Sequence, residues 1–203
     1  MRLYIVRHGE PATFEGLDRP LSDLGRRQAH ATGAFLAKAR PVALYVSPFR
    51  RTVETAREIC SVLGLRAWVR PGLSEFFVPE GMKDFRGMTV SALRSEFRFL
   101  DFPAGMPEDE WWPRWPETGA DVDQRVAEEV GDIFAQWGAS QEAVVLVGHG
   151  ASCKSALRAA LSPDQWPGED VGHDHCGLSL VEGPHPSACA LLFQNQTSHR
   201  PGE

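Results

Sequence analysis

Short apolar runs recur along the chain and are separated by longer amphipathic stretches. The runs are rich in Val and Leu and are bounded by polar residues or glycine. Runs of this length and composition are typical of strands that are buried on both faces of a sheet. We therefore predict strands at residues 2–6, 42–46, 143–147, 178–181 and 189–193.

The stretches between these runs carry helical periodicity and helix-ending signals. Ser22 can cap a helix, Gly64 can end one, and a helix must end before Pro163. We therefore predict four helices. The first follows Ser22, the second spans about residues 50–63, the third carries apolar positions from Val122 to Trp137, and the fourth begins near Ala151. Strands alternating with helices predict an α/β fold in which helices flank a mainly parallel sheet. We expect the whole chain, residues 1–203, to form one such domain.

Residues 76–118 interrupt this alternation. They hold nine of the chain's seventeen Phe and Trp residues, together with several Pro and Gly residues. We expect an irregular insertion that folds over the functional edge of the sheet as a lid. Its aromatic rings could form a small satellite core or could contact a substrate, and the sequence leaves both alternatives open.

Composition and charge exclude several classes of protein. The net charge is −6 and the Lys and Arg residues are spread along the chain, so no nucleic-acid-binding surface is indicated. No apolar run reaches the length of a membrane span or of a signal-peptide core. The four cysteines form no CxxC pair, which favours reduced and mostly buried thiols. We expect a cytoplasmic protein without a nucleic-acid or membrane partner.

Two of the predicted strands end in a histidine that lies next to glycine. The first strand leads into Arg7-His8-Gly9-Glu10, and the strand at 143–147 leads into Gly148-His149-Gly150. The carboxyl ends of strands are where open α/β sheets bind ligands. The helix that follows His149 would also point its first N–H groups at the same place, which suits an anion.

A third strand end carries arginine. The strand at 42–46 leads into Ser47-Pro48-Phe49-Arg50-Arg51. Arginine presents a rigid fork of donors that matches phosphate oxygens, and it stays charged at any working pH. Two histidines with Arg7 and Arg51 would form a compact cationic pocket. A neutral imidazole there can attack phosphorus while the arginines neutralise charge on the phosphate oxygens.

Taken in order, these motifs resemble those of the histidine phosphatase superfamily, also called the phosphoglycerate mutase-like family. The resemblance rests on Arg7-His8-Gly9-Glu10, Leu21-Ser22 with Gly25 and Gln28-Ala29, Ser47-Pro48 with Arg51 and Thr55-Ala56, and Gly148-His149-Gly150. Weaker echoes are Glu117-Thr118 with Asp121 and Arg125, and residues 195–199.

The resemblance implies a role for each matching residue. His8 would be the nucleophile, and Glu75 would donate a proton to the leaving oxygen. The phosphate would be bound by Arg7, Arg51, His149 and Gly150, with His149 also counted among the catalytic residues. The stretch after Glu75 departs from the usual family pattern, so Glu80 and Asp84 stay open as alternative acids.

The chemistry implied by this family needs no cofactor and no metal. Residues 173–176, His-Asp-His-Cys, do include side chains of the types that bind zinc. Such clusters before a strand are more often polar loop residues, and we expect no metal site there.

The function that follows is hydrolysis of a phosphomonoester of a small metabolite through a phosphohistidine, as in a histidine acid phosphatase-type phosphatase. A phosphoglycerate-type mutase is an alternative, which the short loop between His8 and Leu21 and the end of the chain soon after His199 disfavour. A protein phosphohistidine phosphatase is a second alternative, which the long insertion disfavours. A catalytically inactive binding module is a third, and the intact motifs argue against it. The small-molecule phosphate ester is the expected partner, and a homodimer stays open.

Overall fold

The computed structural model describes residues 1–13, 16–76, 83–168 and 170–201. These residues form one seven-stranded sheet in the order β4-β3-β2-β5-β1-β6-β7. Strands β4, β3, β2, β5 and β1 run parallel, whereas β6 pairs antiparallel with β1 and β7 pairs antiparallel with β6 at one edge. The predicted mainly parallel sheet is therefore confirmed. The strands are β1 (Arg2–Arg7), β2 (Ala43–Val46), β3 (Ala67–Val69), β4 (Leu100–Asp101), β5 (Ala143–Gly148), β6 (Leu178–Glu182) and β7 (Ala190–Gln196).

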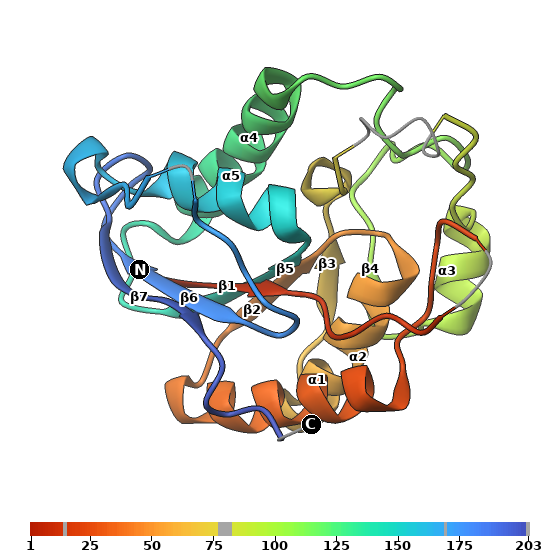
Figure 1. Cartoon of the computed structure of the whole chain (residues 1–203), viewed down its shortest axis with the longest axis horizontal. Coiled ribbons are helices and arrows are strands. Elements are labelled where there is room, and N and C mark those ends of the chain that lie inside the picture. The colour runs from red at the N-terminus through yellow and green to blue at the C-terminus, as the bar shows by residue number, and fades with distance from the viewer. Residues whose placement is uncertain (14–15, 77–82, 169, 202–203) are drawn as a thin grey trace.

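Helices cover both faces of this sheet. In Figure 1, α4 and α5 lie above the sheet, and α1 and α2 lie below it. The α-helices are α1 (Asp23–Leu36), α2 (Arg50–Leu63), α3 (Val90–Glu96), α4 (Gly119–Trp137) and α5 (Gly150–Ala160). Short 3-10 turns are η1 (Ala37–Ala39), η2 (Pro71–Leu73) and η4 (Pro163–Gln165). The four helices predicted from periodicity correspond to α1, α2, α4 and α5.

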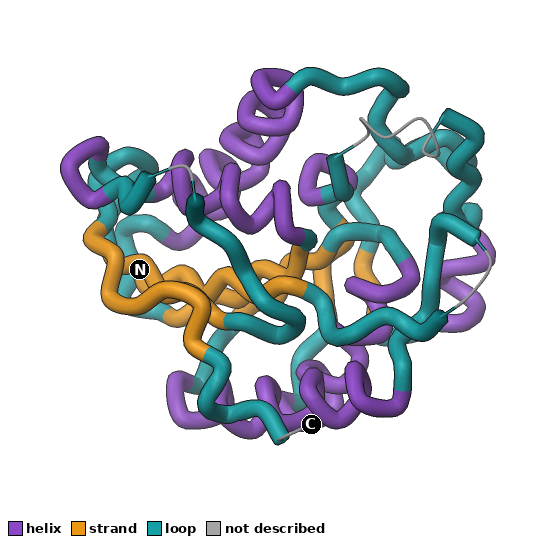
Figure 2. Tube along the Cα trace, viewed as in Figure 1, coloured by secondary structure: helices purple, strands orange, loops and turns teal. Residues whose placement is uncertain are grey.

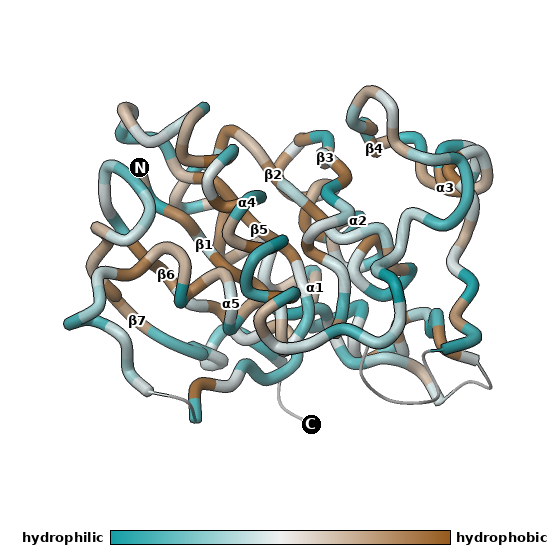
Figure 3. Tube along the Cα trace, turned by 90° about the horizontal axis from the view of Figure 1, so that it is seen from above, coloured by the Kyte–Doolittle hydropathy of each residue, from teal (hydrophilic) through white to brown (hydrophobic). Residues whose placement is uncertain are grey.

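The core has two halves, one on each face of the sheet. Val145 of β5 packs into the half between the sheet and helices α1 and α2, while its neighbour Leu146 packs into the half between the sheet and helices α4 and α5. All six residues of β5 are buried, because both faces of a central parallel strand are covered. The central strands β1 and β5 accordingly run as brown, hydrophobic segments through the middle of the molecule (Figure 3).

Local signals in the sequence set the helix ends. The Ser22 hydroxyl accepts a hydrogen bond from the Gly25 N–H and caps α1. Gly64 ends α2 with a φ of 69°, a left-handed conformation that glycine adopts at little cost. These two helix boundaries agree with those expected from the sequence.

The prediction that residues 76–118 are irregular throughout is wrong for residues 90–101. Helix α3 and strand β4 lie within this stretch, and β4 pairs with β3 so that Leu100 lies beside Ala67. Leu93 and Leu100 are buried in the core half under α1 and α2. The remainder of the described stretch runs as loop and turn, drawn teal in Figure 2. Strands of two or three residues leave no periodicity to detect, and their pairing partners define them.

Several rings of the insertion form a satellite cluster. Phe85 and Trp111 are buried together with Phe49, and Trp112 packs against them. The rings of Phe49 and Phe85 stack with centroids 4.6 Å apart. Of the two alternatives left open by the sequence, the satellite core is therefore the one that these rings adopt.

All four cysteines are buried and unpaired, in agreement with the prediction of buried thiols. None of the helices in the described ranges combines the length and apolar character needed to cross a membrane.

Candidate active site

The parallel register of the central strands brings their polar ends together. Strand β5 lies between β1 and β2, and Arg7 at the end of β1 lies beside Gly148 at the end of β5. His8 and His149 are the next residues along each chain segment, and their ring centroids are 5.3 Å apart. Ser47 follows β2 at the same edge. The two histidines predicted from separate motifs therefore share one site.

The hydrogen bonds of His8 determine which ring nitrogen carries the proton. Nδ1 lies 2.7 Å from the carbonyl oxygen of Gly9, and a carbonyl can only accept, so Nδ1 holds the hydrogen. The Nε–H of Arg51 donates to Nε2 of His8 at 3.2 Å. Burial, followed by the nearby charge of Arg51, lowers the pKa of His8 well below its ordinary value. His8 is thus neutral, with its Nε2 lone pair directed into the site.

His149 presents an unpartnered nitrogen to the same space. Its Nε2 lies 2.9 Å from the Ser47 hydroxyl oxygen. Its Nδ1 is buried and has no hydrogen-bond partner among the described residues. Burial and the charge of Arg51 lower the pKa of His149 well below its ordinary value. If the Ser47 hydroxyl donates to Nε2, Nδ1 carries a hydrogen that can be donated to a ligand oxygen.

Two arginines line this space. The guanidinium of Arg51 lies over the ring of Phe49, 4.7 Å from its centroid. Nη1 of Arg7 donates to the carbonyl oxygen of His173 at 2.7 Å, while Nε of Arg7 is buried and has no partner among the described residues. Both side chains therefore approach His8 with fixed orientations and positive charge.

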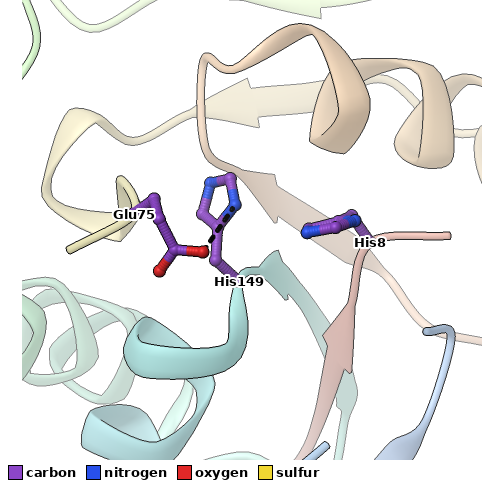
Figure 4. Close-up of side chains that lie close together, drawn as sticks. All are labelled: His8, Glu75 and His149. Atoms are coloured by element: carbon purple, nitrogen blue, oxygen red, sulfur yellow. Dashed lines mark ion pairs between the residues drawn. The ribbon is translucent and has the colours of Figure 1, made fainter. Parts of the chain in front are cut away.

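Glu75 is the carboxylate that faces the two histidines (Figure 4). Its Oε1 accepts a hydrogen bond from the Phe76 N–H at 3.0 Å. Its Oε2 lies 3.7 Å from Nη2 of Arg51 and 3.8 Å from Nδ1 of His149. The side chain is 26% exposed, so the carboxylate is in contact with solvent while the two histidines are buried.

Ligand atoms of His8, Glu75 and His149 all lie within 4.8 Å of one another. In the described ranges, this is the group of His, Cys, Asp and Glu side chains that is close enough to share a cation. Two adjacent arginines make the space unfavourable for a cation and favourable for an anion. Asp84, an alternative acid, does not belong to this group, and Glu80 lies outside the described residues.

Gly150, also expected to contact phosphate, is the first residue of α5. A Cβ placed on Gly150 would meet no other atom within 4 Å. The start of α5 beside His149 is therefore uncrowded, and a ligand oxygen can approach its N–H groups.

The motif residues around the site hold the first loop against α1 and α2. The N–H of Gly9 donates to the Thr55 hydroxyl at 3.0 Å, and the N–H of Glu10 donates to the Gln28 side chain at 3.0 Å. A Cβ at Gly9 would lie 2.6 Å from the carbonyl oxygen of Gly25. Both glycines are therefore needed where these two backbones cross.

His175 is a further residue of the site that was not predicted from the sequence. Its ring centroid lies 5.5 Å from that of His8, and the N–H of Cys176 bonds to the carbonyl oxygens of Arg7 and His8. Because β6 is antiparallel to β1, the residues before β6 lie beside the end of β1. The His-Asp-His-Cys run, considered for zinc, was the available signal.

At the strand ends of this mainly parallel α/β sheet lie a neutral buried histidine, a second histidine, two arginines and a carboxylate. This combination is typical of enzymes that transfer or hydrolyse phosphoryl groups. The model of the histidine phosphatase superfamily (branch 1) matches residues 3–196. The chain belongs to this superfamily, as its motifs indicated.

Curated proteins and solved structures include chains that are similar to this one. The glucosyl-3-phosphoglycerate phosphatase of Mycolicibacterium vanbaalenii is 34% identical over 183 residues, which cover 82% of this chain and 77% of that protein. The structure of a mycobacterial glucosyl-3-phosphoglycerate phosphatase with inorganic phosphate aligns with a TM-score of 0.67 and 27% identity, covering 98% of each chain. The ecdysone phosphate phosphatase of Bombix mori shares the fold, with a TM-score of 0.71 at 20% identity over 100% of this chain and 94% of that one.

Proposed function

We propose that this protein hydrolyses phosphate monoesters through a phosphohistidine formed on His8. The observation that carries the proposal is the hydrogen-bond geometry of the His8 ring. Its Nδ1–H is held by the Gly9 carbonyl, which leaves Nε2 with a lone pair beside Arg51. A neutral, oriented imidazole next to cationic donors is the form that can attack phosphorus.

The other residues have complementary roles in this proposal. Arg7, Arg51, the Nδ1–H of His149 and the N–H of Gly150 bind the phosphate oxygens and stabilise the charge that develops on them. When the ester binds, a phosphate oxygen takes the place of His8 Nε2 as acceptor for Arg51. The lone pair on Nε2 is then available to the phosphorus atom.

The reaction proceeds in two steps. In the first, Nε2 of His8 bonds to phosphorus as the ester P–O bond breaks, and the carboxyl group of Glu75 gives its proton to the leaving oxygen. In the second, the Glu75 carboxylate takes a proton from water. The water oxygen then bonds to phosphorus as the N–P bond breaks, which restores His8 and releases phosphate.

A small, polar metabolite is the substrate class that we propose. The names of the mycobacterial relatives point to a phosphoglycerate that carries a glucosyl group. In this chain, Phe85 and Trp111 pack into the satellite cluster behind Phe49, which reduces the aromatic surface left for an apolar leaving group. The net charge of −6 supports the absence of a nucleic-acid partner, and the buried free thiols support a reducing, cytoplasmic location.

The proposed intermediate can be tested directly. The purified protein is mixed with substrate, quenched in alkali because phosphohistidine is labile in acid, and digested for mass spectrometry. The proposal predicts one phosphoryl group on the peptide that contains His8. A phosphoryl group on another residue, or steady turnover without any labelled peptide, would contradict it.

The substrate class calls for a second experiment. Glucosyl-3-phosphoglycerate, 3-phosphoglycerate, sugar phosphates and aryl phosphates are compared by kcat/KM. We expect a glycerate or sugar ester to exceed every aryl ester. Transfer of phosphate to a second alcohol instead of to water would support the mutase alternative. Separately, light scattering of the same sample would distinguish a monomer from a homodimer.

A further inference from the structure

A single arginine of α4 holds the backbone that carries Glu75. Nη1 of Arg125 donates to the carbonyl oxygens of Gly72 and Ser74 at 2.6 and 2.9 Å. Nη2 of Arg125 donates to the carbonyl oxygen of Glu75 itself at 3.1 Å. Three carbonyls of one short segment, residues 72–75, are therefore bonded to the same guanidinium group.

Glu117 fixes the orientation of this guanidinium. Its Oε1 accepts from Nε of Arg125 at 2.7 Å, and its Oε2 accepts from Nη2 at 3.0 Å. The Glu117 side chain is only 6% exposed. With two bonds to Glu117 and three to segment 72–75, each of the five N–H groups of Arg125 can have a partner. A bidentate, buried pair of this kind has one preferred geometry.

One turn further along α4, Glu129 holds the same segment from its other side. The N–H of Gly72 donates to Oε1 of Glu129 at 2.9 Å. A Cβ at Gly72 would lie 2.5 Å from Cγ of Glu129, so a larger residue would push the segment away from the helix. Both the N–H and the carbonyl of Gly72 are thus bonded to side chains of α4.

The carboxylate of Glu75 has few constraints of its own. Oε1 is held by the adjacent Phe76 N–H, which moves with the same backbone. The distances from Oε2 to Arg51 and His149 are 3.7 and 3.8 Å, longer than hydrogen bonds. The position of Oε2 relative to His8 therefore depends on where the backbone of residues 72–76 lies.

We propose that Arg125, oriented by Glu117, is a positioning residue that keeps the Glu75 carboxyl group in line with the leaving oxygen. This inference rests on the proposed role of Glu75 as the general acid. A displacement of about 1 Å in a reacting group can cost on the order of 10²-fold in rate. Loosening the backbone should therefore weaken proton donation and leave the nucleophile and the phosphate-binding residues in place.

The test compares two leaving groups. An alkyl phosphate needs its leaving oxygen protonated, whereas p-nitrophenyl phosphate needs little protonation. Arg125→Lys keeps the charge and removes the fork, and we expect it to lower kcat for the alkyl ester by roughly 10- to 100-fold. The loss on p-nitrophenyl phosphate should be under about 3-fold. A double variant with Glu75→Gln should be no slower on the alkyl ester than Glu75→Gln alone, because the two residues act through one step.

A matched control lies on the same helix. Asp123 of α4 bonds to Arg158 and Ser155 of α5, and Asp123→Asn should change neither ester by more than about 2-fold. If Arg125→Lys does not fold, as judged by circular dichroism, Glu117→Gln provides the same readout, because it removes one charged acceptor and retains the shape.

The outcomes separate this inference from the proposed function. If Glu75→Gln slows the alkyl ester selectively while Arg125→Lys slows both esters equally or not at all, the positioning role is wrong and the function of Glu75 stands. If Glu75→Gln itself slows both esters equally, Glu75 is not the acid, and the positioning role is overturned with it. Selective slowing in both variants supports both.

Discussion

Nε of Arg51 lies 3.2 Å from Nε2 of His8, so the positive charge of Arg51 influences the protonation state of His8. The arginine donates its N–H to the lone pair and also disfavours a proton on the same nitrogen. Arg51 lies in the first turn of α2 and His8 directly follows β1. Helix α2 and the end of β1 are far apart in sequence, and their contact keeps the His8 imidazole neutral.

The first prediction concerns the tautomer and charge of His8. At pH 6 its ring should be neutral with the hydrogen on Nδ1, because burial and Arg51 lower its pKa well below the ordinary value of 6.5. A long-range 1H–15N NMR spectrum of the free protein would show an unprotonated Nε2. A His8 ring that is doubly protonated at pH 6 would contradict the electrostatics described here.

The same shift has a consequence for stability. His8 and His149 both resist protonation in the folded state, whereas the unfolded chain binds protons at these residues below about pH 6.5. The unfolded state therefore gains protons as the pH falls, and the free energy of unfolding should decrease below pH 6.5. Urea unfolding between pH 7 and 5 measures this decrease. His149→Gln should make it shallower, and an unchanged slope would show that His149 does not contribute.

Activity should depend on the two histidines to different extents. His8→Ala should abolish turnover because it removes the attacking nitrogen. His149→Ala should lower kcat by about 10²- to 10³-fold, the usual effect of losing one donor to a developing negative charge. His30→Ala, on the exposed side of α1, is the control and should retain full activity. Native rates in the His8→Ala protein would disprove the mechanism.

Asp18 should make folding stability depend on pH in the direction opposite to that expected for His8 and His149. Its Oδ1 accepts from the Arg50 N–H at 2.8 Å, while its Oδ2 is buried and has no partner among the described residues. Burial raises the pKa of Asp18 from 3.8 to about 6. The folded state holds this proton more tightly, so stability is lost as the pH rises from about 4 to 6, by roughly 3 kcal/mol at most.

Asp18→Asn isolates this effect because the amide oxygen can still accept from Arg50. Relative to the native protein, the variant should gain stability as the pH rises from 4 to 6, measured by urea unfolding at each pH. A difference between the two proteins that does not vary over this range would mean that Asp18 ionises normally.

Position 9 has no room for a side chain larger than that of glycine. A Cβ at this position would lie 2.6 Å from the backbone carbonyl oxygen of Gly25, so Gly9→Ala should destabilise the protein by about 1–3 kcal/mol. Gly131, inside α4, is the matched control, because a Cβ there meets nothing within 4 Å. Gly131→Ala should instead stabilise the protein by about 0.5–1 kcal/mol. Thermal unfolding of both variants measures the contrast, and equal effects would refute it.

Much of the fold was predictable because it depends on local patterns. Val-rich runs, a serine cap and a terminal glycine indicated β5, α1 and α2 close to their observed boundaries. His8, Arg51 and His149 could be placed at one edge because parallel strands align their carboxyl ends. Strands β3 and β4 were missed, since segments of three and two residues are defined by their neighbours and not by their own periodicity.

The residues at the strand ends could be identified from local patterns alone, because each directly follows a buried run that is a few residues long. Tertiary structure decided the rest. The position of Glu75 depends on Arg125, fifty residues away, and His175 reaches His8 because β6 is antiparallel to β1. The orientation of a side chain and the pairing of distant strands become fixed only when the chain packs, so no local pattern encodes them.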